Sequence, residues 1–225
     1  MDKHIAFYNK SLNKINKELR TNIIDSKSRF YHPSLTEKLQ LHMDVLLTNT
    51  KLYPFKRLYD LPWKIKFFKT KYNIEKNYPH THHGTIFFPS NYFSFDKNER
   101  ISLLIHEKIH IYQRFFPIPY HKILFDKYNL RVQALVSSHA DFNNIRQNPD
   151  NNLLIYSDNG QYTLPIFKKK PLSIKDVVFV DYNEHNTQTV YSKLSKNEHP
   201  NETFAYHITK SILDGTIHQS FIKYL

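Results

Sequence analysis

The chain has 225 residues, of which 40% are hydrophobic and 23% charged, and this balance predicts a packed core rather than disorder. It has no cysteine, which excludes disulfides, thiolate metal sites and cysteine nucleophiles, and only three glycines, which excludes the glycine-rich loops of common nucleotide-binding folds. The net charge of +12 admits a nucleic acid partner, but the lysines are spread along the chain, as an AT-rich coding sequence would also produce.

Residues 1–60 are expected to form a helical N-terminal segment. Apolar residues recur with helix-like spacing over 1–20 and again over about 34–50. The first twenty residues contain no apolar core of a signal peptide, and no stretch of the chain reaches the length of a membrane span. We therefore expect an intracellular, cytoplasmic protein with no membrane span.

Residues 61–225 are expected to form a catalytic domain of the α+β class, compact with the N-terminal segment. Residues 63–68 alternate apolar and basic side chains, which predicts a half-buried strand. The polar segment 79–84 reads as a histidine-rich turn, and a second short strand follows at 85–89. Pro89 closes that strand and would be tolerated best on the edge of a small mixed sheet.

The best-defined helix of the sequence begins after Asp96. Asp96 and Glu99 have the spacing of a capping box, in which each side chain bonds a free backbone N–H of the first turn. An apolar stripe follows along one face, and Pro117 ends the helix soon after Phe116. The stripe consists of Ile101, Leu104, Ile105, Ile109 and Tyr112.

Four further elements are expected beyond this helix. A helical region is predicted over about 120–145. Residues 153–156 and 161–167 suggest a hairpin around an Asp-Asn-Gly turn, and 176–182 a further strand. A last helix is predicted from about Pro200 to Leu213. Because helices and strands are segregated rather than alternating, α+β is the expected class.

His106, Glu107 and His110 form an HExxH motif inside the best-defined helix. Side chains four residues apart lie on the same helix face, so both imidazoles can bind one tetrahedral Zn²⁺. Glu107 lies beside that face and can take a proton from the attacking water. The alternative is two ordinary helix-face histidines flanking a solvated Glu-Lys pair.

A catalytic zinc ion needs a third protein ligand. The short-range third histidine of the pattern HExxHxxGxxH is absent, so a glutamate from another helix is required, and Glu202 is the preferred candidate. Glu202 also has a purely structural explanation, because a glutamate in the first turn after Pro200 stabilises a helix start. His199, Glu198 and Asp141 are its competitors.

The motif HEKIH at 106–110, together with the later Asn201-Glu202-Thr-Phe-Ala205, resembles the gluzincin superfamily of thermolysin-like metallopeptidases. This resemblance implies a zincin-like fold, with a central HExxH helix and a second helix that bears the glutamate. It also implies that His106, His110 and Glu202 are zinc ligands and that Glu107 is the general base. Those enzymes usually have an aspartate four residues after the glutamate; here that residue is Tyr206, so the zinc-bound histidines must be oriented differently.

A second resemblance concerns longer strings within residues 60–213. Segments 79–84, 106–114, 146–150 and 198–202 are similar to small zinc peptidases predicted in large DNA viruses and marine microbes. If the protein is viral, its location would be the host cytoplasm or the virion.

Other residues are candidates for the rest of the reaction. Tyr206 lies one turn beyond Glu202 and is the first choice to stabilise the oxyanion, with a packing role as its alternative. Arg146 is assigned to substrate binding. In the resembled peptidases the strand before the HExxH helix forms the rim of the cleft, so Gly84, Thr85 and Ile86 are expected to pair with a substrate chain, with an ordinary buried strand of the sheet as the alternative. The histidines of segment 79–84 could bind a metal, although exposed loop residues are the commoner case.

The expected function is therefore that of a zinc metallopeptidase, with Zn²⁺ as cofactor and a peptide or protein as substrate. Two alternatives remain open at this stage. One is a basic nucleic-acid-binding module in which HEKIH is accidental. The other is an inactive scaffold that keeps the fold and the zinc ion.

Overall fold

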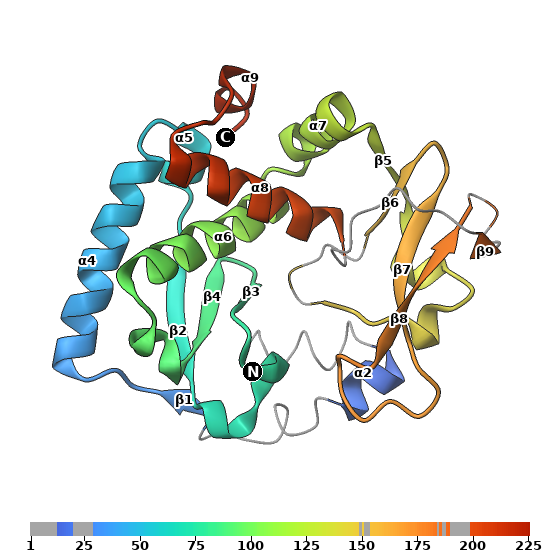
Figure 1. Cartoon of the computed structure of the whole chain (residues 1–225), viewed down its shortest axis with the longest axis horizontal. Helices are drawn as coiled ribbons and strands as arrows, with labels where there is room; N and C mark the ends of the chain where they lie inside the picture. The colour runs from blue at the N-terminus through green and yellow to red at the C-terminus, as the bar shows by residue number, and fades with distance from the viewer. Residues whose placement is uncertain are drawn as a thin grey trace. The chain divides into compact units, whose positions relative to one another are not determined.

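The computed structural model describes residues 13–19, 29–148, 150, 154–183, 185, 188–189 and 199–225 (Figure 1). It is a mixed structure of helices and strands, so the expected α+β class is confirmed. The chain divides into two compact units. Unit 1 comprises residues Met1–Asp25 and Ile118–Thr203, and unit 2 comprises Ser26–Pro117 and Phe204–Leu225.

The boundary expected near residue 60 falls inside unit 2. Helices α4 and α5, which precede it, pack against α6 in this unit. The elements of unit 2 are β1 (Phe30–Tyr31), α4 (Leu35–Leu52), α5 (Lys56–Asp60), β2 (Lys64–Phe68), β3 (His80–His82), β4 (Thr85–Pro89), α6 (Lys97–Phe115) and α9 (Gln219–Ile222), with short 3-10 helices at Thr70–Tyr72, Ile74–Asn77 and Ser90–Ser94.

Helix α8 (Pro200–Asp214) is one continuous helix whose first turn counts with unit 1 and whose remainder, from Phe204, belongs to unit 2. It matches the helix expected from Pro200. Its apolar face is buried through Phe204, Ala205, Ile208 and Ile212. In the part of the chain that the structure describes, no helix combines the length and the apolar character needed to cross a membrane.

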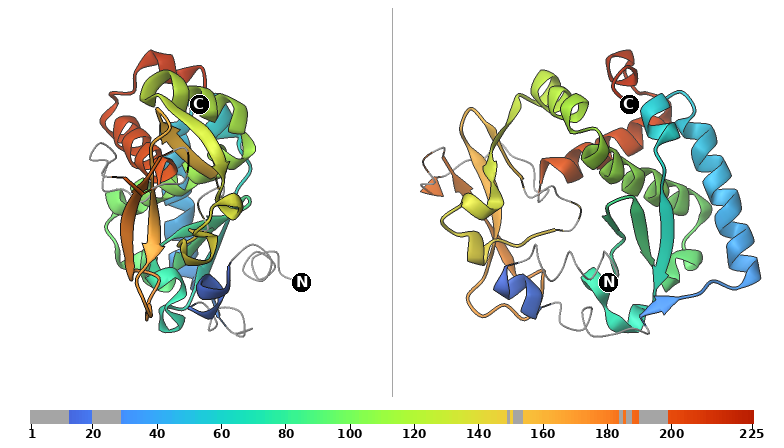
Figure 2. Two further views of the ribbon diagram at one scale, coloured as in Figure 1. Left: turned by 90° about the vertical axis from the view of Figure 1, so that its right-hand side faces the viewer. Right: turned by 180° about the vertical axis from the view of Figure 1, so that it is seen from behind.

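The sheet of unit 2 has the strand order β1-β2-β4-β3. The rear view in Figure 2 shows β2 and β4 side by side; they are parallel, with Lys64 opposite Thr85. Strand β3 runs antiparallel to β4, with His80 opposite Phe87 and His82 opposite Thr85. Both sides of β4 are therefore bonded, and the prediction that this strand lies at the sheet edge is wrong.

The error has a simple origin, because the segment expected to be a histidine-rich turn folds as strand β3 and covers β4. Strand β3 reaches only as far as Phe87, so no β3 residue lies opposite Pro89. The N–H that proline lacks is not needed there, which explains how a proline ends an interior strand.

Helix α6 follows the sequence pattern closely. Asp96 caps it: its carboxylate accepts a hydrogen bond from the Glu99 N–H, and the Glu99 carboxylate accepts one from the Asp96 N–H. The expected apolar stripe is buried along its whole length. Phe116 is the C-cap and Pro117 starts the next helix. Local signals therefore define both ends of the helix that carries the HExxH motif.

Helix α4 lies alongside α6 in Figure 1 and in the rear view of Figure 2. A buried ion pair joins the two helices: Arg100 Nε donates to Asp44 Oδ2 at 2.7 Å, and Arg100 Nη2 to Asp44 Oδ1 at 3.2 Å. The hydroxyl of Tyr92 also donates to Asp44, and the low-dielectric surroundings raise the pKa of this tyrosine. The core face of α4 is thus polar at its centre.

Unit 1 is built mainly from short antiparallel strands. Its elements are α2 (Lys14–Glu18), α7 (Pro117–Tyr128), β5 (Leu130–Leu135), β6 (Leu154–Asp158), β7 (Tyr162–Phe167), β8 (Val177–Tyr182) and β9 (Gln188–Thr189), with 3-10 helices at Val136–Ser138 and Phe142–Asn144. Strand β5 pairs with β6, and β7, β8 and β9 form a separate sheet in that order. They enclose a core of Val136, Ile145, Ile155, Tyr162, Leu164 and Tyr182.

Two expectations for this region need correction. The helix expected over 120–145 ends at Tyr128, and the chain continues as strand β5 because β6 offers it a partner. The tight turn expected at residues 158–160 is present, with Asn159 and Gly160 both at positive φ (49° and 76°). Beyond one bridge between Asp158 and Gln161, however, β6 and β7 diverge and each pairs with another strand.

Candidate metal centre

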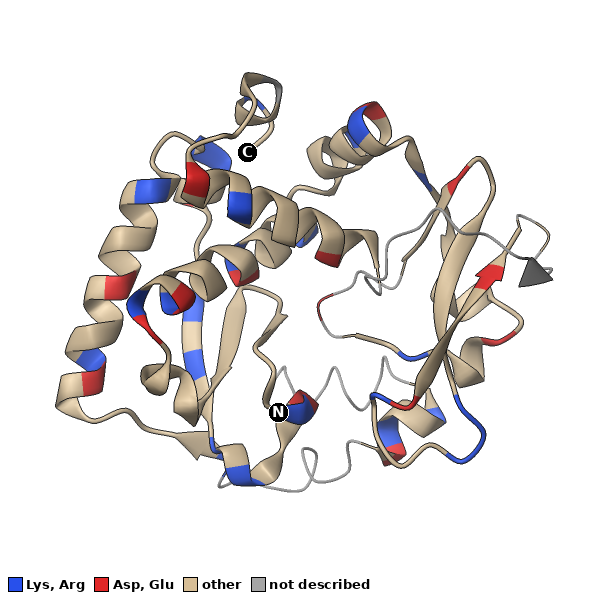
Figure 3. Cartoon of the chain, in the orientation of Figure 1, with Lys and Arg blue, Asp and Glu red and all other residues tan. Residues whose placement is uncertain are grey.

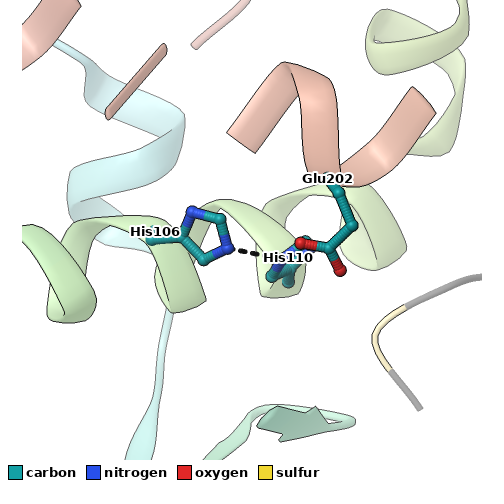
Figure 4. A group of neighbouring side chains, drawn as sticks. All are labelled: His106, His110 and Glu202. Carbon is teal, nitrogen blue, oxygen red and sulfur yellow. Dashed lines mark hydrogen bonds between the residues drawn. The ribbon is translucent and has the colours of Figure 1, made fainter. Parts of the chain in front are cut away.

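The two histidines of the HExxH motif lie together on one face of α6. His110 follows His106 by four residues, about one helical turn, so their rings project in the same direction. The Nε2 atoms of His106 and His110 are 3.1 Å apart, and the ring centroids are 4.8 Å apart with the ring planes at 80° (Figure 4). Both side chains are buried. Two nitrogen donors thus converge in a site largely screened from water.

The spacing of these two nitrogens fits a metal ion. Tetrahedral Zn²⁺ with bonds of about 2.0–2.1 Å holds its ligand atoms about 3.3 Å apart, close to the observed 3.1 Å. Neutral imidazole nitrogens are among the commonest ligands of zinc and related divalent cations. The donor set and its geometry therefore fit zinc.

Gln113 fixes the ring of His110. Its Oε1 atom lies 3.0 Å from Nδ1 of His110, and the glutamine is fully buried. With the proton on Nδ1 of His110 this contact is a hydrogen bond, and Nε2 then keeps its lone pair. Such an outer partner sets both the tautomer and the direction of a metal-binding histidine. Gln113 is therefore the candidate for this role in place of the aspartate missing at Tyr206.

Glu107 is buried on α6 between the two histidines in sequence. It is only 3% exposed, and one of its carboxylate oxygens lies within 4.8 Å of a ring nitrogen of His110. A carboxylate this close to the imidazoles and shielded from solvent can act on a water molecule bound at the same site. The structure thus brings the expected base to the expected ligands.

Tyr206 joins the site from α8, since its ring centroid lies 4.5 Å from that of His106. The residue is 61% exposed. One turn earlier on the same helix is Glu202, whose carboxylate is directed toward His110 in Figure 4. One ligand atom each from His106, His110 and Glu202 lie within 4.8 Å of one another. These are the three ligands expected from the sequence.

The carboxylate of Glu202 is itself oriented by a neighbour. Nδ2 of Asn148 donates to Glu202 Oε1 at 3.1 Å. Glu202 also lies in the first turn of α8, where a negative charge stabilises the helix start. The structural explanation and the ligand role are therefore compatible at this position.

Lys108 anchors another side of α6. It is fully buried, its Nζ donates to the backbone oxygen of Tyr59 at 3.1 Å, and it lies 4.8 Å from the centre of the Trp63 ring. Burial lowers the pKa of Lys108 to about 8, although nearby Asp60 acts in the opposite direction. These contacts hold α6 against α5 and the start of β2.

The residues expected to bind a substrate chain instead make backbone contacts within unit 2. Thr85 and Ile86 are bonded on both sides within the sheet, so the prediction that they pair with a substrate is wrong. The Gly84 oxygen accepts from the Lys64 N–H at 2.8 Å. A Cβ at Gly84 would make an ordinary van der Waals contact with the backbone oxygen of Pro62, at 3.4 Å.

In the described part of the chain, β3 is one of the two outer strands of this sheet, and it packs against α6. Nη1 of Arg114, near the end of α6, donates to Thr81 Oγ1 at 2.6 Å. His80 is stacked on Phe87, with ring centroids 5.4 Å apart, and its side chain is buried. Among the described residues, the histidines of this segment belong to no group of three potential metal ligands. They serve packing.

The remaining candidates lie in unit 1. Arg146 is half-buried there, and its backbone N–H donates to the Pro165 oxygen at 2.8 Å. His199 caps α8: Nδ1 accepts from the Asn201 N–H and Nε2 lies 2.9 Å from the Leu154 oxygen, so neither ring nitrogen is left for a metal. Asp141 accepts a bond from the Tyr182 hydroxyl at 2.7 Å. Glu198 lies outside the described residues.

Sequence reasoning missed Gln113 and Asn148 as partners of the ligands. Gln113 had a readable signal, since it lies three residues after His110 and so on the same helix face. Asn148 had none, because its neighbour Glu202 is 54 residues away.

Comparison of the chain with models of known protein families, with curated proteins and with solved structures gave no match. The functional assignment therefore rests on the side chains of α6 and α8.

Proposed function

We propose that this protein is a zinc-dependent hydrolase, and specifically a metallopeptidase of the gluzincin type with a zincin-like fold. The observation that supports this most is the convergence of His106 and His110, 3.1 Å apart at Nε2, with the Glu202 carboxylate from a second helix. Two imidazoles and one carboxylate are the ligands of the zinc in thermolysin and carboxypeptidase A.

A zinc ion held by these three side chains would polarise the substrate carbonyl and lower the pKa of a water molecule, leaving one coordination position open. Gln113 keeps the Nε2 lone pair of His110 available, and Asn148 holds one oxygen of Glu202. Both contacts restrict the conformations of the proposed ligand side chains before a metal ion binds.

The chain's own groups then carry the proton transfers. Glu107 accepts a proton from the attacking water and delivers it to the amine that leaves when the peptide bond breaks. The Tyr206 hydroxyl donates a hydrogen bond to the oxygen that becomes negative as the tetrahedral carbon forms. The ring of this tyrosine contacts the ring of His106, with the centroids 4.5 Å apart.

The sheet of unit 2 suggests where a peptide would lie. In the zincin-like arrangement expected from the sequence, an edge strand lies beside the HExxH helix. Here the edge strand next to α6 is β3 rather than β4. We propose that a peptide or protein substrate runs along this side of α6.

The nucleic-acid alternative draws only on the net charge. Figure 3 shows Lys and Arg distributed over helices, strands and loops of each unit. That reading predicts tight binding to DNA or RNA, weakening steeply with salt, and a purified protein without zinc. Metal analysis separates it from the peptidase.

The variant Glu107→Gln tests the proposal. It should retain one zinc ion per chain and lose peptide hydrolysis by at least about 100-fold, since a positioned general base contributes 10²–10⁴-fold. The assay is cleavage of a peptide library by zinc-loaded protein, read by mass spectrometry. Glu99→Gln, on the same helix but in its capping box, is the matched control and should keep full activity.

Full activity in Glu107→Gln would remove the proposed base. Zinc bound by the wild-type protein without cleavage of any peptide would instead support the inactive scaffold.

A further inference from the structure

On α4, polar side chains occupy buried positions and large apolar side chains are exposed, which is the reverse of the pattern on an ordinary surface helix. Its fully buried positions include Asp44 and Thr48. Five large apolar side chains on or just after it are between 47% and 74% exposed. They are Leu35, Leu39, Met43, Leu46 and Tyr53. A surface helix normally turns its apolar stripe to the core.

The attachment of α4 to the core does not use these residues. Its centre is held by the buried ion pair of Asp44 with Arg100, and its C-terminal end by Leu52, which is fully buried. Such a local conflict between pattern and environment is expected where a surface has another purpose. The exposed stripe on α4 therefore needs a separate explanation.

The five apolar residues form one continuous stripe. At 100° per residue they fall within an arc of about 80°, together with Thr50, and they extend about 27 Å along the helix axis. Five side chains exposed by about half or more provide roughly 500 Å² of apolar surface, the upper end of what a monomer leaves in one patch. We call these residues and Thr50 the α4 stripe.

Few charges border the α4 stripe. The helix has four charged residues, of which Asp44 is buried, Glu37 bonds Ser34 and Tyr31, and Lys38 and Lys51 are exposed. Lys38 is the nearer of the two lysines to the stripe on the helical wheel, and Figure 3 shows most of α4 without charge. Helices that lie on membranes instead carry many Lys and Arg on their polar face. The charge pattern favours a protein partner over an anionic lipid surface.

We propose that the α4 stripe binds the same stripe of a second copy of this chain, with the two helices antiparallel. About a point between Asp44 and Val45, the inner residues of the stripe map onto one another. In that arrangement Met43 faces the partner's Leu46 and Leu39 faces the partner's Thr50, while Leu35 lies one residue away from facing the partner's Tyr53.

A two-fold interface is the commonest symmetry of homo-oligomers, and it uses one patch twice. The α4 stripe would form the apolar centre of such an interface, and Thr36, Lys38, His42 and Asn49 its polar rim. A standard interface needs about 800 Å² from each partner, of which the stripe supplies more than half. This contact is independent of the metal centre.

Cross-linking tests the antiparallel pairing directly, because the chain has no cysteine and any introduced one is unique. Leu35→Cys and Tyr53→Cys are each treated with a short bismaleimide, alone and mixed. In an antiparallel pair, residue 35 of one copy lies about 27 Å from residue 35 of the other. The two copies of residue 53 are separated by a similar distance. The mixture should therefore cross-link strongly while each variant alone does not. Leu172→Cys, a still more exposed position in unit 1, is the control.

If the mixture cross-links no more strongly than Leu172→Cys does, the proposal is wrong. Strong cross-linking of each variant alone would overturn the antiparallel arrangement.

Sedimentation provides the second measurement. Wild-type protein should be dimeric at micromolar concentration, and Met43→Lys should weaken dimerisation at least tenfold, whereas Leu172→Lys should not. A monomeric wild-type protein that floats with phosphatidylserine vesicles would assign the α4 stripe to a membrane surface and refute the dimer.

Discussion

Replacing Gln113 by leucine removes the oxygen that orients His110 while keeping a side chain of similar size. The bond at stake joins Nδ1 of His110 to Oε1 of Gln113 at 3.0 Å, and Gln113 is fully buried, so water cannot easily take its place. Without the acceptor, the proton of His110 is free to move to Nε2, where it blocks the metal. Loss of such a partner costs 10–100-fold in metal affinity.

That range corresponds to about 1.4–2.8 kcal/mol of zinc binding free energy. The assay is a competition titration of each variant against a chromophoric chelator at fixed pH. Gln113→Glu retains an acceptor at the same place and should keep affinity near that of the wild type. The circular dichroism spectrum of the metal-free variants serves to confirm that the helix is intact. If Gln113→Leu binds zinc within twofold of the wild type, Gln113 does not position His110.

Two further predictions concern other parts of unit 2. Asp44→Ala leaves the buried Arg100 without its carboxylate and should lower the free energy of unfolding by about 3–5 kcal/mol, measured by urea denaturation. Asp60→Ala breaks an exposed pair with Lys56, should cost at most about 1 kcal/mol, and is the control; equal losses would contradict the importance of burial. Tyr206→Phe keeps the ring against His106 and should preserve zinc affinity while lowering kcat about 100-fold. An unchanged kcat would leave this tyrosine a packing role only.

The elements that the sequence predicts best are those with local signals. Helix α6 has its capping residues and its stop at Pro117 within the segment itself, and α8 begins at Pro200. Strand β3 and strand β5 were missed because each is defined by a partner strand rather than by its own residues. Three residues containing two histidines carry almost no strand signal alone.

The candidate metal centre likewise combines residues with a local sequence signal and residues without one. His106, Glu107 and His110 are predicted by helix periodicity alone, and Glu202 needs the motif at the start of a second helix. The edge position expected for β4 was wrong because it depended on how a neighbouring segment folds. The face of α4 turned to the core is likewise decided by a long-range contact, the pairing of Asp44 with Arg100 from α6.

Metal content measured by mass spectrometry on purified protein tests the central proposal most directly. We expect one zinc ion per chain in the wild type, none in the double variant His106→Ala/His110→Ala, and a strongly reduced content in Glu202→Ala at limiting zinc. Wild-type protein that fails to bind zinc under saturating conditions, or a double variant that binds as much as the wild type, would contradict the metal centre.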